Sequence, residues 1–145
     1  MDIFDDNLRA LYAKAQKAAA DEPSCSERYT QQTFIAKGSI KEVYSVMDNT
    51  TGRRVALALL QEGLDEHSAR LFKREARLNA LLQHPNILPV YDAGTNEQGR
   101  PFMIMKLVEG RDLKQLINDS AITFDALIEV FEKICEALAY AHSRG

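Results

Sequence analysis

One carboxylate interrupts an apolar stripe in the middle of the chain. The stripe has spacings of four, three and four residues, typical of one helix face, and consists of Leu71, Glu75, Leu78 and Leu82. An ionised carboxylate among apolar side chains costs free energy unless a cation pairs with it. Two interpretations are open: Glu75 is solvated at the edge of the stripe, or it points at a cation in a cleft.

A glycine lies at a bend between two expected strands. The segment reads Ile35-Ala36-Lys37-Gly38-Ser39-Ile40-Lys41-Glu42-Val43-Tyr44. A phosphate cradle needs a small residue at such a bend, because backbone N–H groups must approach the phosphate oxygens closely. Many hairpins without a ligand also have a glycine there, so Gly38 by itself leaves both interpretations open.

The elements that would position these residues form an α+β pattern. Residues 29–60 predict β structure, and the turn signal at residues 49–52 predicts that 41–48 and 53–60 pair as an antiparallel hairpin. Further along, the sequence predicts a helix over residues 66–83 and then two short strands over residues 87–93 and 101–107. Two more helices are expected over residues 112–118 and about 124–143.

The first residues predict a separate helix. Apolar side chains recur at helical spacing over residues 3–20, and Asp5 and Asp6 lie in the first turn, where the helix dipole favours acidic groups. Residues 21–27 contain Pro23 and are typical of a linker. This helix is either an appendage packed on the domain or a dedicated partner-binding element.

Composition argues against several classes of function. The chain has 18 basic and 21 acidic residues and a net charge of −3, which disfavours nucleic-acid binding through bulk charge. No uncharged stretch is long enough for a membrane span. Cys25 and Cys135 lack CxxC spacing, so we expect reduced thiols in a cytoplasmic protein. Three histidines and two cysteines form no recognisable metal-ligand pattern.

Six segments, taken in order, resemble the N-terminal lobe of a protein kinase, in particular bacterial serine/threonine kinases of the eukaryotic type. Residues 35–44 resemble the glycine-rich loop, Val55-Ala56-Leu57-Ala58 the third strand, and Phe72-Lys73-Arg74-Glu75-Ala76 the C-helix with its glutamate. Residues 84–87 resemble the H-P-N-I motif that follows the C-helix, and residues 101–110 resemble the fifth strand with the hinge. Residues 139–145 resemble the end of the E helix.

The resemblance implies a domain organisation. A helical extension and linker would occupy residues 1–28, and the kinase N-lobe, a five-stranded antiparallel sheet with the C-helix, residues 29–108. Residues 109–145 would then be the hinge exit and the D and E helices of an incomplete C-terminal lobe.

The resemblance also implies an ATP site. Gly38 would lie at the phosphates, and Met105 would occupy the gatekeeper position. The residues implied to surround the adenine are Ile35, Val43, Ala56 and Met105 through their side chains, and Lys106 and Val108 through backbone groups. Each of these apolar residues is also compatible with an ordinary core.

The chain departs from the family pattern at its end. In the family, the catalytic loop H-R-D-x-x-x-x-N begins about two residues after the equivalent of Gly145, and D-F-G follows later. Because both loops lie beyond this sequence, the catalytic aspartate and the magnesium ligands do too. We expect this truncated fragment to be inactive by itself, with ATP and Mg²⁺ used by a longer parent that phosphorylates protein.

A second departure is chemical. Ala58 stands where the family has its third-strand lysine, and Ala36 and Lys41 replace the first and third glycines of the loop. These losses fit a pseudokinase. Lys41 beside a missing third-strand lysine also resembles the "with-no-lysine" kinases, in which a second-strand lysine contacts the phosphates, so catalytic roles for Lys41 and Glu75 are implied. Lys37 is another candidate for the cation.

Strand geometry supports Lys41. Side chains alternate along a strand, so Lys41 shares a face with Val43. A hairpin centred between Thr50 and Thr51 pairs Val43 with Ala58, which makes Lys41 and Ala58 diagonal neighbours, roughly 7–8 Å apart. A lysine stem can bridge much of that gap, and Glu75 could then pair with Lys41.

Three functional hypotheses follow. The chain is the ATP-binding lobe of a serine/threonine kinase, a pseudokinase scaffold for protein interactions, or a regulatory binding module built on the first helix. The helix over 124–143 has an apolar face that consists of Leu127, Phe131, Ile134 and Leu138. We expect this face to mediate self-association or to fold back on the sheet, and the helix expected over residues 3–20 is a candidate to cover it.

Overall fold

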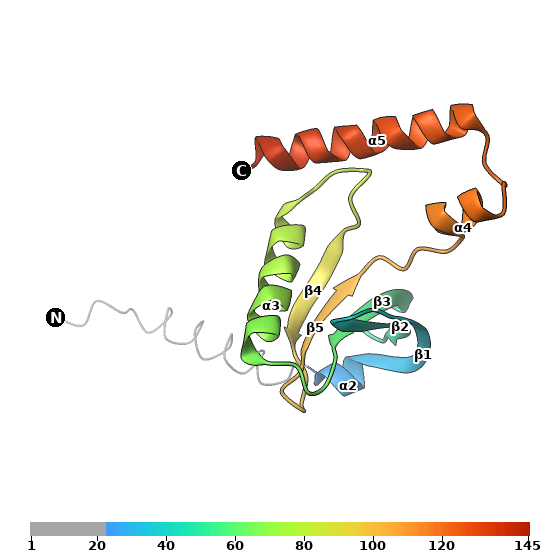
Figure 1. The fold of residues 1–145 in the computed structure, drawn as a ribbon. Helices are drawn as coiled ribbons and strands as arrows, with labels where there is room; N and C mark the ends of the chain where they lie inside the picture. The colour runs from blue at the N-terminus through green and yellow to red at the C-terminus, as the bar shows by residue number, and fades with distance from the viewer. Residues whose placement is uncertain (1–22) are drawn as a thin grey trace, which may run out of the picture.

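The computed structural model describes residues 23–145. Its elements are α2 (Cys25–Arg28), β1 (Tyr29–Lys37), β2 (Lys41–Asp48), β3 (Arg53–Leu60), α3 (Glu66–Leu81), β4 (Val90–Thr95), β5 (Pro101–Met105), α4 (Leu113–Asn118) and α5 (Phe124–Ser143). Figure 1 shows the sheet with α3 along one side, and α5 beyond the sheet after the extended segment that follows β5. The helix expected over residues 3–20 lies outside the described residues.

The strands form one five-stranded antiparallel sheet in the order β1-β2-β3-β5-β4. The β2–β3 hairpin has the expected register, with Val43 opposite Ala58 and Lys41 opposite Leu60. Gly52 closes its turn at a φ of 67°, a conformation that glycine adopts without a steric penalty. The expected hairpin is therefore confirmed in both bounds and register.

Apolar side chains pack on both faces of this sheet, because successive residues of a strand point to opposite sides. The cluster beside α3 consists of Ala58, Leu60, Phe72, Ala76 and Met103, with Val43 and Met105 packed against it. The cluster on the other face consists of Tyr29, Val46, Val55, Leu57, Leu59, Phe102 and Ile104. The near-continuous burial of β3 follows from this two-sided packing.

The α3 helix contacts the sheet with a face other than its leucine stripe. Its buried residues are Phe72 and Ala76, whereas Leu71 and Leu78 are 45% and 51% exposed. Ala76 allows α3 to approach the sheet closely, and neighbouring residues lie about 100° apart around a helix, so Leu71 turns away. Leu71 and Leu78, which flank Glu75 in the apolar stripe, therefore lie away from the contact between α3 and the sheet.

The short helix α2 lies within the segment that was expected to be a linker. A capping box starts it: the Ser24 hydroxyl accepts from the Glu27 N–H, and the Glu27 carboxylate accepts from the Ser24 N–H. The Ser26 N–H and hydroxyl both donate to Glu97 in the β4–β5 loop, each at 2.9 Å. Residues 25–28 are thus fixed to the sheet, through contacts 71 residues apart that no local pattern shows.

The β4 strand begins three residues later than expected. Pro89 precedes it and has no N–H to donate, so it ends the strand pattern on that side. Its carbonyl accepts from the Lys106 N–H at 3.1 Å, just after β5 ends at Met105.

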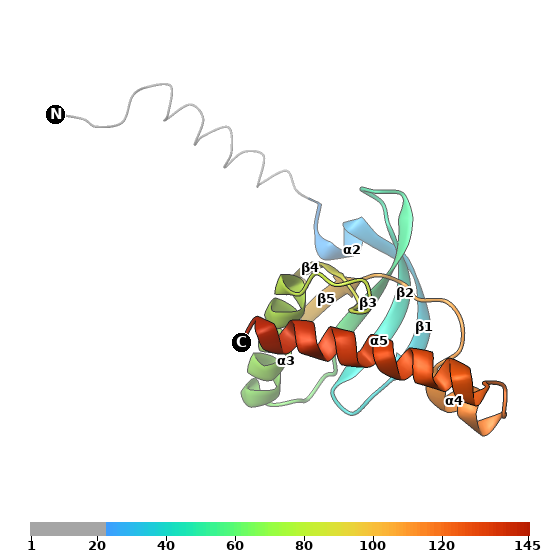
Figure 2. The ribbon, with the colours of Figure 1, turned by 90° about the horizontal axis from the view of Figure 1, so that it is seen from above.

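The α5 helix has the expected bounds, and its apolar face is exposed. Thr123 caps it by accepting from the Ala126 N–H. Phe131 and Leu138 are 62% and 51% exposed, so α5 does not fold back on the sheet. Seen from above in Figure 2, the C-terminal part of α5 passes across α3. The Gln83 N–H, two residues after the end of α3, donates to the Tyr140 hydroxyl at 3.1 Å. None of the described helices is both long and apolar enough to cross a membrane.

Candidate functional site

An ion pair joins the sheet to α3. Lys41, the first residue of β2, places its Nζ 2.6 Å from the Oε1 of Glu75 in the middle of α3. The two side chains are 34% and 48% exposed. At that exposure the pair contributes at most about 1 kcal/mol to stability. Its geometry therefore matters more for positioning the ammonium group than for holding the fold together.

The register explains how Lys41 reaches Glu75. Residues opposite one another in an antiparallel pair share a face, so Val43 and Ala58 lie on the α3 side of the sheet. Lys41 is two residues from Val43 and has the same orientation. Ala58 is fully buried in the cluster beneath α3 and carries no functional group there.

Lys37, the other candidate cation, pairs elsewhere. Its Nζ lies 2.9 Å from the Oε1 of Glu42, the neighbour of Lys41 that points to the opposite face. Glu42 also accepts a hydrogen bond from the Tyr44 hydroxyl at 2.9 Å. The hydrogen bond from Lys37, followed by that from Tyr44, lowers the pKa of Glu42. The two lysines of the turn are thus held on different faces.

The turn at Gly38 is held by backbone contacts and one side chain. The Gly38 N–H donates to the Lys41 carbonyl at 2.9 Å, and the Gln61 N–H donates to the Ile40 carbonyl at 2.9 Å. The Gln61 side-chain amide donates to the Gly38 carbonyl. A Cβ at position 38 would meet the Lys41 carbonyl at 3.6 Å, an ordinary contact. Packing within the chain therefore does not require glycine at position 38.

Three of the residues implied for the adenine site come together on one sheet face. Ala56 is buried and lies opposite Met105, and Val43 packs against the same cluster as Met105. The other two apolar positions are peripheral: Ile35 is 48% exposed at a bulge in β1, and Val108 is 67% exposed. The Lys106 N–H is already bonded to Pro89, so its carbonyl is the group that can accept from a ligand.

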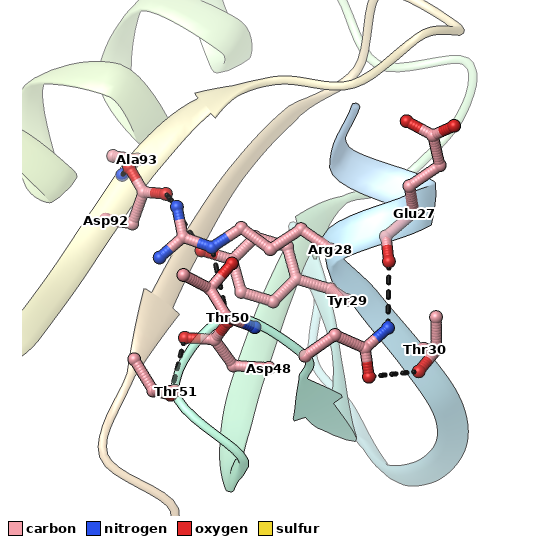
Figure 3. Close-up of polar contacts among 10 residues, drawn as sticks. Glu27, Arg28, Tyr29, Thr30, Asp48, Thr50, Thr51, Asp92 and Ala93 are labelled. Carbon is pink, nitrogen blue, oxygen red and sulfur yellow. Dashed lines mark hydrogen bonds and ion pairs between the residues drawn. The ribbon is translucent and has the colours of Figure 1, made fainter. Parts of the chain in front are cut away.

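A polar cluster around Arg28 was not anticipated from the sequence (Figure 3). The guanidinium donates from Nε to Asp48 at 3.2 Å and from Nη1 to Asp92 at 3.1 Å. The Tyr29 hydroxyl donates to Asp92 at 2.8 Å. Burial, followed by this hydrogen bond, raises the pKa of Tyr29. The cluster fixes α2 to β2 and β4, and its members come from three separate parts of the chain.

Asp48 is the most deeply buried member of that cluster, at 2% exposure. Burial acts to raise its pKa, but hydrogen bonds from Arg28, Thr51 and the Thr50 N–H outweigh it and hold the pKa below the usual value. The only sequence signal was the position of Asp48 immediately before the turn. Within residues 23–145 no three His, Cys, Asp or Glu side chains are grouped to hold a metal ion.

Comparison with known proteins decides the family. Residues 29–145 match the protein kinase domain. The chain belongs to the protein kinase family. Its resemblance to bacterial kinases is also direct: it is 35% identical over 133 residues to the serine/threonine-protein kinase PknD of Chlamydia pneumoniae. It is 34% identical over 127 residues to the kinase PknA of Mycobacterium tuberculosis.

The kinase fold is shown as well. The crystal structure of the Mycobacterium tuberculosis PknI kinase domain is similar with a TM-score of 0.65 and 29% identity, over 81% of this chain and 50% of that one. The PknD match covers 82% of this chain and 14% of PknD, and the PknA match covers 83% and 30%. The sheet with α3 is therefore the N-lobe of a bacterial kinase of the eukaryotic type, and the chain spans a small part of these relatives.

Proposed function

We propose that this kinase chain supplies the ATP-binding lobe of a serine/threonine protein kinase, with Lys41 in the role of the missing third-strand lysine. The observation that carries the proposal is the 2.6 Å contact between Lys41 Nζ and Glu75. In active kinases a lysine held by the C-helix glutamate contacts the ATP phosphates. Ala58 leaves that position without a cation, and Lys41 is the lysine that meets the glutamate.

The sheet face around Val43, Ala56 and Met105 is where we propose that the adenine binds. Small and apolar side chains allow a flat ring to lie against the strands, and backbone groups fix its orientation. We propose that the Lys106 carbonyl accepts from the adenine amine, and that the Val108 N–H donates to the ring. Backbone contacts do not depend on side-chain type, so the charge of Lys106 does not oppose this arrangement.

The phosphates would lie between the Gly38 turn and Lys41. Glu75 holds the ammonium group of Lys41 on the ligand side of the sheet, while the Glu42 pair keeps Lys37 on the other side. Phosphoryl transfer by kinases also needs magnesium and a catalytic aspartate. The described residues contain no group of three His, Cys, Asp or Glu side chains that could hold a metal ion.

A pseudokinase is the second candidate, favoured by specific residues. Ala58, together with Ala36 in place of the first glycine of the loop, removes groups that catalysis normally uses. In that case the N-lobe would act through protein contacts, and the exposed face of α5 is the self-association surface that we propose. A cytoplasmic location would suit either function, because Cys25 and Cys135 are free thiols.

Transfer of the γ-phosphoryl group separates the two candidates. The experiment uses the complete gene product with labelled ATP and a general protein acceptor, with Glu75→Gln as the comparison variant. A kinase transfers label, and the variant transfers less. Binding of ATP without any transfer supports the pseudokinase, and absence of ATP binding contradicts both the adenine site and the role of Lys41.

A further inference from the structure

One glutamine contacts the turn between β1 and β2 at two points. Gln61 directly follows Leu60, the last residue of β3. Its side-chain amide donates to the Gly38 carbonyl at 2.5 Å, and its backbone N–H donates to the Ile40 carbonyl at 2.9 Å. Gln61 therefore holds the turn on both sides of Ser39, although it lies 23 residues after Gly38 in the sequence.

These contacts decide which backbone groups of the turn are occupied. The carbonyls of Gly38 and Ile40 accept from Gln61. The Lys41 carbonyl accepts from the Gly38 N–H at 2.9 Å. Among the described residues, no backbone carbonyl accepts from the Ser39 or the Ile40 N–H. Because successive N–H groups form an anion-binding concavity, the turn is arranged to receive negative charge.

The end of β3 gives Gln61 a fixed base. Arg100, just before β5, donates to the Leu60 carbonyl from Nε at 2.9 Å and from Nη2 at 2.7 Å. Its Nη1 donates to the Glu62 carboxylate at 3.0 Å. One guanidinium thus holds the residues on both sides of Gln61, and the Arg100 side chain is only 20% exposed. The Gln61 amide therefore reaches the turn from a restrained strand end.

The turn needs this contact, because sterics alone do not fix it. A Cβ at position 38 would meet the Lys41 carbonyl at 3.6 Å, so the backbone there is not crowded into one conformation. Glycine also adopts a wide range of φ and ψ. The Lys37–Glu42 ion pair beside the turn restrains it little, because the Lys37 side chain is 57% exposed. The hydrogen bonds of Gln61 are the stronger restraint on residues 38–40.

We propose that Gln61 is a positioning residue, which binds the Gly38 carbonyl and so holds the N–H groups of the turn towards the ATP phosphates. Gln61 itself does not touch the nucleotide. This inference rests on the proposed function, which places the phosphates between the turn and Lys41. It adds a residue outside the turn that controls the phosphate contact.

Hydrogen exchange tests the hold on the turn without any nucleotide. Mass spectrometry reads the exchange of a peptide over residues 35–44 in the complete gene product. Gln61→Leu removes the donor, and Gln61→Glu keeps the side-chain length but replaces the donor with an acceptor. Both variants should speed exchange at least about threefold, as expected for one lost hydrogen bond. Gln98→Leu, the same change at an exposed position in the β4–β5 loop, should leave the exchange unchanged.

Titration with ATP and with adenosine tests the positioning role. Adenosine has no phosphates, so the comparison separates the phosphate contact from the adenine contact. Gln61→Leu should weaken ATP binding at least about threefold and change adenosine binding by less than about twofold. A variant that merely misfolds would lose both ligands. Gln98→Leu should bind both ligands as the wild type does.

Two results overturn the inference and leave the proposed function intact. Unchanged exchange over residues 35–44 in both Gln61 variants would show that the side chain does not hold the turn. A wild type that binds ATP, with a Gln61→Leu variant that keeps the same ratio of ATP to adenosine affinity, would show that Gln61 does not position the phosphates. Failure of the proposed function is distinct: the wild type then binds no ATP, and the positioning role falls with it.

Discussion

The ammonium group of Lys41 lies 2.6 Å from the carboxylate of Glu75, and the residue opposite Val43, at the position that the resemblance assigns to the third-strand lysine, is Ala58. The pair joins β2 to α3 rather than β3 to α3. Moving the cation by one strand keeps it on the same face of the sheet, because Lys41 and Val43 are two residues apart. The lobe thus retains a lysine held by the helix glutamate, from a different strand.

Glu75→Gln tests whether the glutamate positions Lys41. We expect a Tm within a few degrees of wild type, because a pair this exposed contributes at most about 1 kcal/mol. ATP affinity of the complete gene product should nevertheless fall, because the lysine is no longer held by an opposite charge. The ATP affinities are measured by titration calorimetry. Glu129→Gln, which removes an exposed carboxylate on α5, is the matched control. Equal affinities in the two variants would refute a positioning role.

Returning a lysine to the third strand tests the displacement directly. Ala58→Lys combined with Lys41→Ala should regain a large share of the ATP affinity that Lys41→Ala alone loses. The reason is that positions 41 and 58 are diagonal neighbours on the same face. Thermal melting verifies that the buried substitution still folds. A folded double variant that binds no better than Lys41→Ala would count against the idea that the two positions serve one cation.

The Arg28 cluster predicts a stability effect. Arg28→Ala leaves the carboxylate of Asp48, which is 3% exposed, without its cation. We expect a loss of about 2–3 kcal/mol in the free energy of unfolding, measured by urea denaturation. Arg53→Ala, which removes an exposed cation that stacks on Tyr91, is the comparison and should cost less. A loss below that of Arg53→Ala would show that the cluster does not anchor α2.

The same cluster predicts acid sensitivity. The folded pKa of Asp48 lies below its usual value of 3.8. Its ionised form therefore stabilises the fold fully above that value, and the contribution disappears as the pH falls through the lower, folded pKa. Asp48→Asn should flatten the decline of Tm below about pH 4, whereas Asp125→Asn, at an exposed position, should not. Parallel declines in wild type and Asp48→Asn would contradict this assignment.

The local elements were predictable, because they depend on short patterns. The turn at residues 49–52 determines the β2–β3 register, and that register makes Lys41 a diagonal neighbour of Ala58. The core face of α3 was not predictable: Leu71 is the more apolar choice, but Ala76 and Phe72 fit against the sheet. Ser26 and Glu97, and likewise Arg28 and Asp92, meet across large sequence separations, so spacing alone could not pair them.

The ATP affinity of Lys41→Ala in the complete gene product, compared with that of Lys37→Ala, is the sharpest test of whether Lys41 contacts the ATP phosphates. Both variants remove one cation from the same turn, but only Lys41 pairs with Glu75. We expect Lys41→Ala to lower the ATP affinity at least tenfold, equivalent to about 1.4 kcal/mol, and Lys37→Ala to change it by less than about twofold. Equal affinities in the two variants would contradict it.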